Sequence, residues 1–283
     1  MQTNTNLPQA KGILYFTLLI SVLMILTSAT GIWHQEVYSL ETHEWISQSI
    51  GQDIANLFFI IPLLILSALL VVKGNKRAKI VWTGIMLTNI YSFVIYCFGL
   101  HFNFLFLVYC AILGLSVYAL FYFGQAHSQE NFKEWFTRKV PAKSTSIFLI
   151  VIAGLFLTLW LSSDIPASLN NKAPEEIIKN GLPVNPVHVL DYSFYLPLMV
   201  ISGILLLKKK SSGYFLASVM LVFSVCTNIN IISLTVVGYY KGVVNDISVI
   251  VIFLILTLLS LFFLWRMLKG VVQTQGLRIS NPD

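Results

Sequence analysis

Long apolar runs alternate with short polar segments along the whole chain, and eight of the runs are long enough to cross a lipid bilayer. A hydrocarbon core of about 30 Å requires about 20 helical residues. We therefore predict an all-α transmembrane protein, a bundle of eight helices. The predicted spans are residues 12–33, 54–72, 80–98, 103–124, 146–163, 188–207, 213–239 and 247–268.

One pattern occurs twice. Gly51–Lys79 reads GQDIANLFFIIPLLILSALLVVKGNKRAK, and His188–Lys210 reads HVLDYSFYLPLMVISGILLLKKK, so that Pro197 follows Pro62 by 135 positions. At this offset the identical pairs are Phe59/Phe194, Pro62/Pro197, Leu63/Leu198, Ser67/Ser202, Leu70/Leu205 and Lys73/Lys208. We interpret the pattern as two parallel four-helix repeats, which occur in several transporter folds.

The repeat defines the predicted domain organisation. Residues 1–125 form the first repeat, 126–144 an interfacial linker, 145–270 the second repeat and 271–283 a tail. The first span has features of a signal peptide, but its counterpart at 146–163 indicates a retained helix.

Pro62 and Pro197 are the only prolines inside the predicted spans. A proline inside a helix removes one backbone hydrogen bond and frees the carbonyl four residues earlier, here at Phe58 and Ser193. We therefore predict an equivalent kink in both helices.

Composition and charge support a membrane protein. Hydrophobic residues make up 57% of the chain and charged residues 11%, whereas soluble domains carry about 25% charged residues. The net charge is +6, and the charged residues flank the apolar spans, which argues against a nucleic-acid partner. With the N-terminus inside, only Lys172, Lys179 and Lys241 of the 18 basic residues lie outside. This bias predicts that both termini are cytoplasmic.

Three loop segments carry local signals. We predict a short surface helix within His34–Ser49 and an interfacial helix over Asn131–Val140, whose aromatic residues share one face. In the longest outer loop, Pro174 can open a short helix that Gly181 closes.

Polar residues gather at the outer ends of the even-numbered spans. His188, Asp191 and Tyr195 are spaced i, i+3, i+7 and share one helical face. We predict that this stripe and its counterpart in the first half line a cavity that opens outward between the halves. The candidate ligand-binding residues are Asp53, Asn56, Asn103, His188, Asp191, Tyr195 and Asp246.

A second interpretation stays open for part of this set. Aspartate and asparagine are preferred N-caps, and Asp53, Asn103 and Asp246 stand where caps belong. Asn56 and Asp191 lie about one turn further in. A carboxylate inside a membrane helix usually faces a partner or a wet cavity.

No cofactor is indicated. A histidine and converging carboxylates can hold a divalent metal, but no HExxH or CxxC spacing is present, and we predict no metal site. The three cysteines lie inside apolar spans, which excludes a disulfide framework or a zinc finger. There is no phosphate loop, dinucleotide fingerprint or nucleophile elbow.

One group of motifs resembles a family of uncharacterised bacterial multi-pass membrane proteins. The motifs are Gly51-Gln52-Asp53 with Pro62, Phe102-Asn103-Phe104-Leu105-Phe106-Leu107-Val108-Tyr109, and Asn185-Pro186-Val187-His188-Val189-Leu190-Asp191 with Pro197. The resemblance covers roughly residues 51–197. It implies a bacterial plasma-membrane location and no activity.

Three functions fit the sequence. The first is a small-solute carrier or binding protein, with the bilayer and a small polar solute as its partners. The second is an intramembrane enzyme, with or without a metal, that uses Asp191 or Asp53 as general base beside His188. The third is a non-catalytic subunit or sensor of a membrane complex. The oligomeric state is not indicated.

Overall fold

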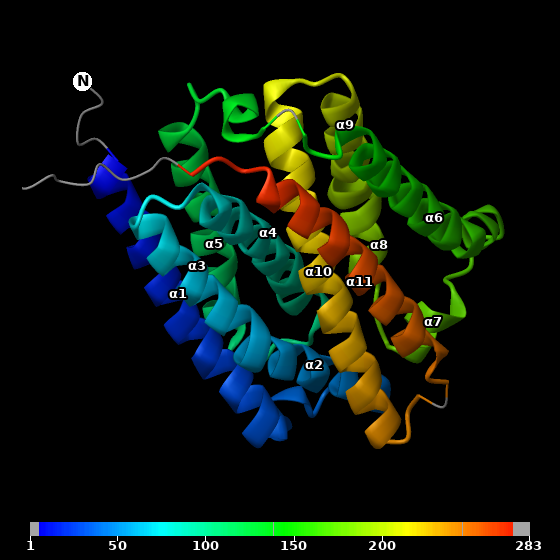
Figure 1. Cartoon of the computed structure of the whole chain (residues 1–283). Helices are drawn as coiled ribbons and strands as arrows, with labels where there is room; N and C mark the ends of the chain where they lie inside the picture. Colours follow the sequence, from blue (N-terminus) through cyan, green and yellow to red (C-terminus); the bar gives the residue numbers. More distant parts are fainter. Residues whose placement is uncertain (1–5, 138, 245, 274–283) are drawn as a thin grey trace, which may run out of the picture.

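The computed structural model describes residues 6–137, 139–244 and 246–273, and within them eight helices are long and apolar enough to cross a membrane (Figure 1). Two of the eight spans are composite. The first composite span is α2 (His43–Ala55), a π-helical turn (Asn56–Ile60) and α3 (Ile61–Val72). The second is α8 (Pro186–Leu190), a π-helical turn (Asp191–Tyr195) and α9 (Leu196–Leu207). The other spans are α1 (Asn6–Trp33), α4 (Lys76–Gly99), α5 (Phe106–Ala126), α6 (Ala142–Leu169), α10 (Ser211–Tyr240) and α11 (Ser248–Lys269). The predicted number and order of spans are confirmed.

Helices α4 and α10 lie against each other in the centre of the bundle. The surrounding helices are α1, α3 and α5 on the side of α4, and α6, α9 and α11 on the side of α10 (Figure 1). Gly84 permits this close approach, because a methyl group on its Cα would overlap the side chain of Val222. Of the most apolar 18-residue stretch of each helix, 72% is buried in α10 and only 17% in α11. The bundle therefore has a packed central pair and a lipid-accessible rim.

Both π-helical turns end two residues before a proline. Pro62 and Pro197 occupy the first turn of α3 and α9. Neither residue can donate a backbone hydrogen bond. Single turns inside an α-helix are the form in which π-helix mostly occurs. A π turn is present in both helices, and the predicted kink stays a prediction.

Several local predictions were wrong. Residues 43–49 belong to α2, which continues into the span, and only Gln35–Tyr38 forms a separate short 3-10 helix. The segment Asn131–Val140 is not an interfacial helix. It contains a 3-10 turn, Phe132–Trp135, followed by an extended Phe136 that pairs with Val271.

The physical reason is burial of the aromatic side chains against the bundle. The ring of Phe132 stacks on Phe215 with centroids 4.3 Å apart, and Trp135 is only 3% exposed. Helix α6 also continues through Pro166 to Leu169. The short α7 (Glu175–Lys179) is confirmed, with Pro174 before it and Gly181 at a φ of 66° after it. From residue 274 on, the predicted tail lies outside the described residues.

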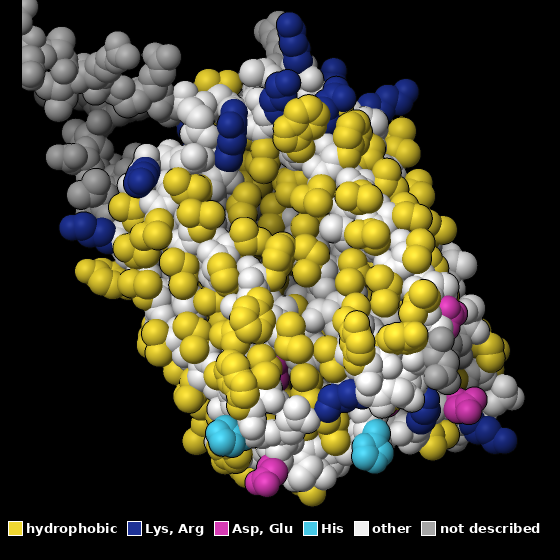
Figure 2. All heavy atoms as spheres, turned by 60° about the horizontal axis from the view of Figure 1, so that its bottom comes forward, with side chains coloured by type: hydrophobic (Ala, Val, Ile, Leu, Met, Phe, Trp, Pro, Cys, Tyr) yellow, Lys and Arg dark blue, Asp and Glu magenta, His cyan; other side chains and the backbone are white. Residues whose placement is uncertain are grey.

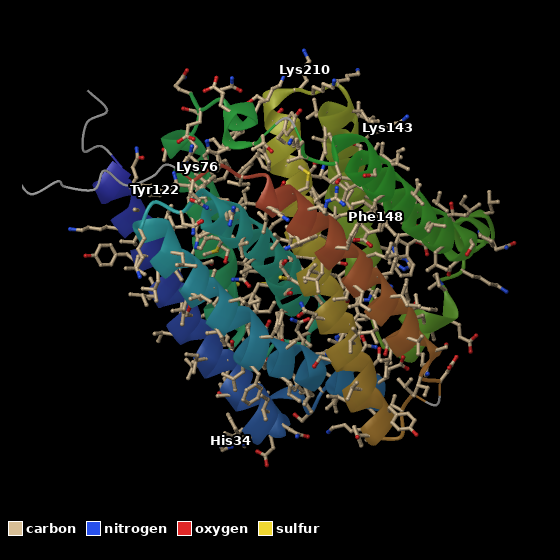
Figure 3. The ribbon with its side chains drawn as sticks, viewed as in Figure 1. His34, Lys76, Tyr122, Lys143, Phe148 and Lys210 are labelled. Carbon is tan, nitrogen blue, oxygen red and sulfur yellow. The ribbon has the colours of Figure 1, made fainter. Side chains whose placement is uncertain are left out.

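Charged side chains are distributed unequally between the two ends of the bundle. Figure 2 shows lysine and arginine gathered at one end, and in Figure 3 Lys76, Lys143 and Lys210 lie at that end while His34 lies at the other. We call these the basic end and the opposite end. The hydrophobic middle between them fits a protein that spans the bilayer many times.

Candidate functional site

Asp53 lies in a sealed polar pocket of the first half. Its side chain is 1% exposed. One carboxylate oxygen accepts a hydrogen bond from the hydroxyl of Tyr38 at 2.7 Å, and the other accepts one from the hydroxyl of Tyr96 at 2.8 Å. Gly31 of α1 forms the wall beside the carboxylate, where any side chain would overlap it. The pocket holds the carboxylate and leaves no room for a ligand.

Tyr38 covers this pocket from the 3-10 helix that follows α1. Burial, helped by Tyr96 and Asp53, raises the pKa of the Tyr38 hydroxyl well above its ordinary value. The hydroxyl therefore stays protonated and remains a donor to the carboxylate. This closure depends on the turn at Gln35–Tyr38, which the sequence pattern did not predict.

The alternative interpretation of Asp53 as an N-cap is wrong. The N-cap of α2 is Thr42, whose side chain accepts from the backbone N–H of Trp45 at 3.3 Å. Asp53 lies near the other end of that helix. Asn56 begins the π turn, is 1% exposed, and accepts a hydrogen bond from Gln52 at 2.9 Å.

His188 and its neighbours form a second polar cluster in the other half of the chain. Nδ1 of His188 lies 2.8 Å from a carboxylate oxygen of Asp164, and the hydroxyl of Tyr192 donates to the same oxygen at 2.8 Å. Asn185 caps α8 by accepting from the backbone N–H groups of Val187 and His188. The cap fixes the start of the helix and therefore the position of the imidazole.

Trp160 connects this cluster to Asp191. Its indole N–H donates to Asp191 at 2.8 Å, and its ring packs on the imidazole of His188 with centroids 4.5 Å apart. The Asp191 carboxylate is therefore held against α6. The ring of Tyr91 in α4 packs against the ring of Tyr195, with centroids 4.7 Å apart.

An open cavity of about 430 Å³ adjoins the second cluster at the opposite end. Asp164, His188 and Tyr192 line it together with the loop that follows α6. The Asp164 side chain is 23% exposed and that of His188 8%. Within the described part of the chain, Nε2 of His188 makes no hydrogen bond. A carboxylate and an imidazole nitrogen are thus available to a ligand in this cavity.

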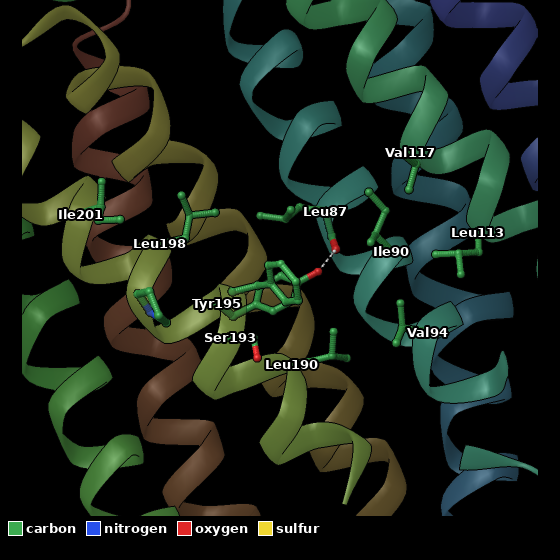
Figure 4. A pocket seen from close by; sticks show the side chains of 12 residues that line it. Leu87, Ile90, Val94, Leu113, Val117, Leu190, Ser193, Tyr195, Leu198 and Ile201 are labelled. Carbon is green, nitrogen blue, oxygen red and sulfur yellow. Dashed lines mark hydrogen bonds between the residues drawn. The ribbon is translucent and has the colours of Figure 1, made fainter. Parts of the chain in front are cut away.

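The structure does not bring the two predicted stripes into one cavity. Tyr195 lines a groove of about 490 Å³ between the halves, and its hydroxyl donates to the carbonyl of Leu87 at 3.1 Å (Figure 4). The other lining side chains of the groove are nearly all apolar. Neither cavity is lined by Asp53, Asn56 or Asp191. Tyr96 donates to Asp53 and Tyr91 packs on Tyr195, so α4 contacts both predicted stripes and lies between them.

Asn103 and Asp246 hold the chain before α5 and α11. The Asn103 side chain accepts from the backbone N–H of Leu105 at 3.0 Å, and Asp246 accepts from that of Ser248 at 2.8 Å. Both residues act on the turn that leads into a helix. The N-caps themselves are Leu105 and Ile247, so the prediction that Asn103 and Asp246 are N-caps was wrong.

Asp164, Trp160 and Tyr192 were missed by the sequence analysis. The predicted span ended at residue 163, so Asp164 was assigned to a loop. One signal was available: Asp164 directly follows the apolar run, and a helix that continued past residue 163 would include it. Tyr192 lies four residues after His188, and this spacing on one helical face was an available signal. Trp160 carried no signal.

Neither a metal centre nor a known relative defines the site. Within the described ranges, no three His, Cys, Asp or Glu side chains lie close enough to hold a metal ion. Comparison with protein-family models, curated proteins and solved structures found no match to this chain. What is established is an integral, multi-pass, all-α membrane protein.

Proposed function

We propose that the protein is a small-solute carrier or binding protein, and that the solute binds in the open cavity beside Asp164 and His188. The observation that carries this proposal is the buried imidazole at the cavity wall, fixed by Asp164 and Trp160 with Nε2 unpaired. Unpaired polar groups in a pre-formed cavity are typical of ligand sites. Asp53 has both carboxylate oxygens occupied and takes no part.

The chemistry of the cavity favours a solute with an ammonium group. Asp164 is the acidic side chain of the cavity lining, and one of its oxygens makes no hydrogen bond within the described chain. A carboxylate in a partly desolvated site pairs well with a cation. Lys172 also lines the cavity and can receive an acidic group of a zwitterion.

A carrier also needs two elements that move against each other, and an internal repeat would supply them. Gly51 of α2 packs against the backbone of Leu234, and a carbon added to Gly99 would lie 3.1 Å from Pro186. Gly51 and Pro186 are 135 positions apart, and so are Gly99 and Leu234. Equivalent contacts at the same offset as Pro62 and Pro197 support the two-repeat proposal.

The proposed orientation places the basic end in the cytoplasm, by the positive-inside rule. The cavity beside His188 then faces outward. In a bacterial cell the protein would lie in the plasma membrane. A cysteine introduced at Asn170 should react with an impermeant thiol reagent in intact cells, and one at Lys209 should not. The reverse labelling would contradict this orientation.

An outward-facing intramembrane enzyme is the second candidate. The pairing of Nδ1 of His188 with Asp164 at 2.8 Å favours it, because an imidazole oriented in this way leaves Nε2 to act as general base. The residues at the cavity are then Asp164 and His188, and not the Asp53 or Asp191 of the sequence hypothesis. Turnover of a solute without any gradient would favour the enzyme over the carrier.

The test is a thermal-shift titration of the detergent-purified protein with ethanolamine, glycine and acetate. A ligand that binds only the folded state stabilises it by about 2.7 kcal/mol at 100 times its Kd. We expect ethanolamine to raise the Tm, glycine to raise it less, and acetate to leave it unchanged. Asp164→Asn should abolish the shift.

Asp53→Asn is the matched control. It should lower the Tm of the unliganded protein, because one of two buried hydroxyl donors loses its carboxylate partner, at a cost of about 1–3 kcal/mol. The shift with ethanolamine should remain. A shift that survives Asp164→Asn, or disappears in Asp53→Asn, would contradict the location of the site.

A further inference from the structure

Two cavities flank the end of α11 at the basic end of the bundle. One, of about 550 Å³, is lined by Arg77, Leu261, Leu264, Trp265, Leu268 and Lys269. The other, of about 460 Å³, is lined by Thr137, Lys139, Trp265, Arg266, Lys269 and Gly270. Trp265 and Lys269 belong to both. The lining therefore contains four basic side chains and, within the described residues, no carboxylate.

The larger cavity is apolar on one side and basic at its rim. Leu261, Leu264 and Leu268 are spaced i, i+3, i+7 and form one stripe of α11. Lys269 follows at the end of this stripe, and Arg77 faces it from the start of α4. A hydrocarbon chain fits the leucine stripe, and an anionic group fits the rim.

The two basic groups are held in place with donors to spare. The guanidinium of Arg77 donates to the carbonyl of Val271 at 3.2 Å, and a guanidinium has five N–H donors. The ammonium of Lys269 lies 5.2 Å from the centroid of the Trp265 ring. These contacts orient both cations at the rim without neutralising their charge.

The surroundings indicate a ligand that comes from the bilayer. Helix α11 is the least buried of the eight spans, and Trp265 is 57% exposed. Tryptophan and basic residues at a helix end mark the membrane–water interface. Basic pockets between transmembrane helices at this level bind acidic lipid head groups. A water-soluble anion would use the rim and leave the leucine stripe empty.

We propose that the groove between α11 and the start of α4 is a binding site for an anionic phospholipid. The phosphate lies between Arg77 and Lys269, and one acyl chain runs along Leu261, Leu264 and Leu268. Lys139 and Arg266 of the adjoining cavity attract the remaining charge of the head group. This site is at the end of the bundle away from the solute cavity and does not depend on the proposed function.

The experiment is native mass spectrometry of the full chain in detergent, titrated with phosphatidylglycerol and with phosphatidylcholine of the same acyl chains. We expect phosphatidylglycerol to bind at least tenfold more tightly. Each basic residue near a charged lipid contributes about 1 kcal/mol, which is about fivefold in affinity. The double variant Arg77→Gln, Lys269→Gln should therefore lose more than tenfold in affinity for phosphatidylglycerol and bind phosphatidylcholine as before.

The double variant Lys208→Gln, Lys210→Gln is the matched control, because it removes the same charge at the same end from residues that line neither cavity. It should keep the preference. Leu261→Trp should fill the groove and weaken both lipids at unchanged charge, and free glycerol phosphate should not displace the lipid. The proposal is overturned by equal affinities for the two lipids, by a preference that survives the first double variant, or by displacement with glycerol phosphate.

Discussion

The chain carries two polar clusters, one around Asp53 and one around His188, and the first is closed while the second is open. Asp53 and His188 are 135 positions apart, as Pro62 and Pro197 are. Asp53 is enclosed by two tyrosine hydroxyls that occupy both of its oxygens. His188 forms one wall of an open cavity of about 430 Å³.

The difference arises in the segments that precede the two composite spans. In the first half, Gln35–Tyr38 turns directly over the end of α1 and places the Tyr38 hydroxyl on Asp53. In the second half, a longer segment containing α7 leads into α8 and forms part of the cavity wall. Similar helices can thus border an enclosed carboxylate or an open cavity, depending on the segment that precedes them.

The largest expected effect is at the wall of the closed pocket. Gly31→Ala adds a methyl group that overlaps the Asp53 carboxylate and comes within 2.6 Å of the Tyr38 hydroxyl. Overpacking of this kind typically costs 1–3 kcal/mol, and a buried network with no room to move should lie at the upper limit. We expect a loss of about 3 kcal/mol in unfolding free energy, measured by chemical denaturation in detergent.

Ala167 is the matched position of the open cluster. Counted from their starts, Gly31 of α1 and Ala167 of α6 occupy the same place in two 28-residue helices. Ala167→Gly leaves the cavity open and costs at most about 1 kcal/mol, the difference in helix propensity. Comparable losses in the two variants would contradict the distinction between a closed and an open pocket.

Sequence reasoning was most successful for features that depend on one helix at a time. The eight spans follow from the length of the apolar runs, and the interruptions at Pro62 and Pro197 follow from the missing backbone donor. The uneven distribution of lysine and arginine between the loops also located the basic end. These features require no knowledge of which helices are neighbours.

The candidate site was predicted only in part, because it depends on contacts between helices. The sequence singled out His188 and Asp191, but it paired them with Asp53 instead of with Asp164 and Trp160 of α6. Whether Asp53 is covered depends on where Tyr38 lies after a turn, and no periodicity encodes that. The aromatic residues of 131–140 were misassigned for the same reason, since their burial against Phe215 is a tertiary contact.

The next, smaller effect depends on pH. It concerns His127, a structural histidine, in contrast to His188 of the open cluster. His127, at the basic end, is 4% exposed, and its Nε2 lies 2.8 Å from the ammonium of Lys79. Burial, and after it the charge of Lys79, lowers the pKa of His127 below its ordinary value of 6.5, against a smaller opposite effect of Glu130. In the pH range between the two pKa values, the unfolded chain therefore binds a proton at His127 and the folded chain does not.

Stability from this source is present above about pH 6.5 and is lost as the pH falls through the folded pKa. One proton limits the slope to about 1.4 kcal/mol per pH unit. We expect His127→Gln to flatten the decline of Tm below pH 6.5 and to leave the thermal shift with ethanolamine unchanged. An unaltered decline would show that other groups cause it.

The smallest expected effects concern the polar residues that precede α5 and α11, Asn103 and Asp246. Asn103→Ala should cost about 0.5–1 kcal/mol, as the loss of a helix-terminal hydrogen bond usually does.

At Asp246, the backbone N–H and hydroxyl of Ser248 hold the pKa below its ordinary value. The stability that Asp246 adds is therefore present at neutral pH and lost as the pH falls through that lowered pKa. Because Asp246 is fully exposed, its removal should change the Tm less than that of Asn103. Neither variant should alter the ethanolamine shift, since each side chain is engaged with its own turn. A loss of the shift in either variant would place that residue in the ligand site and would contradict its purely structural role in the turn.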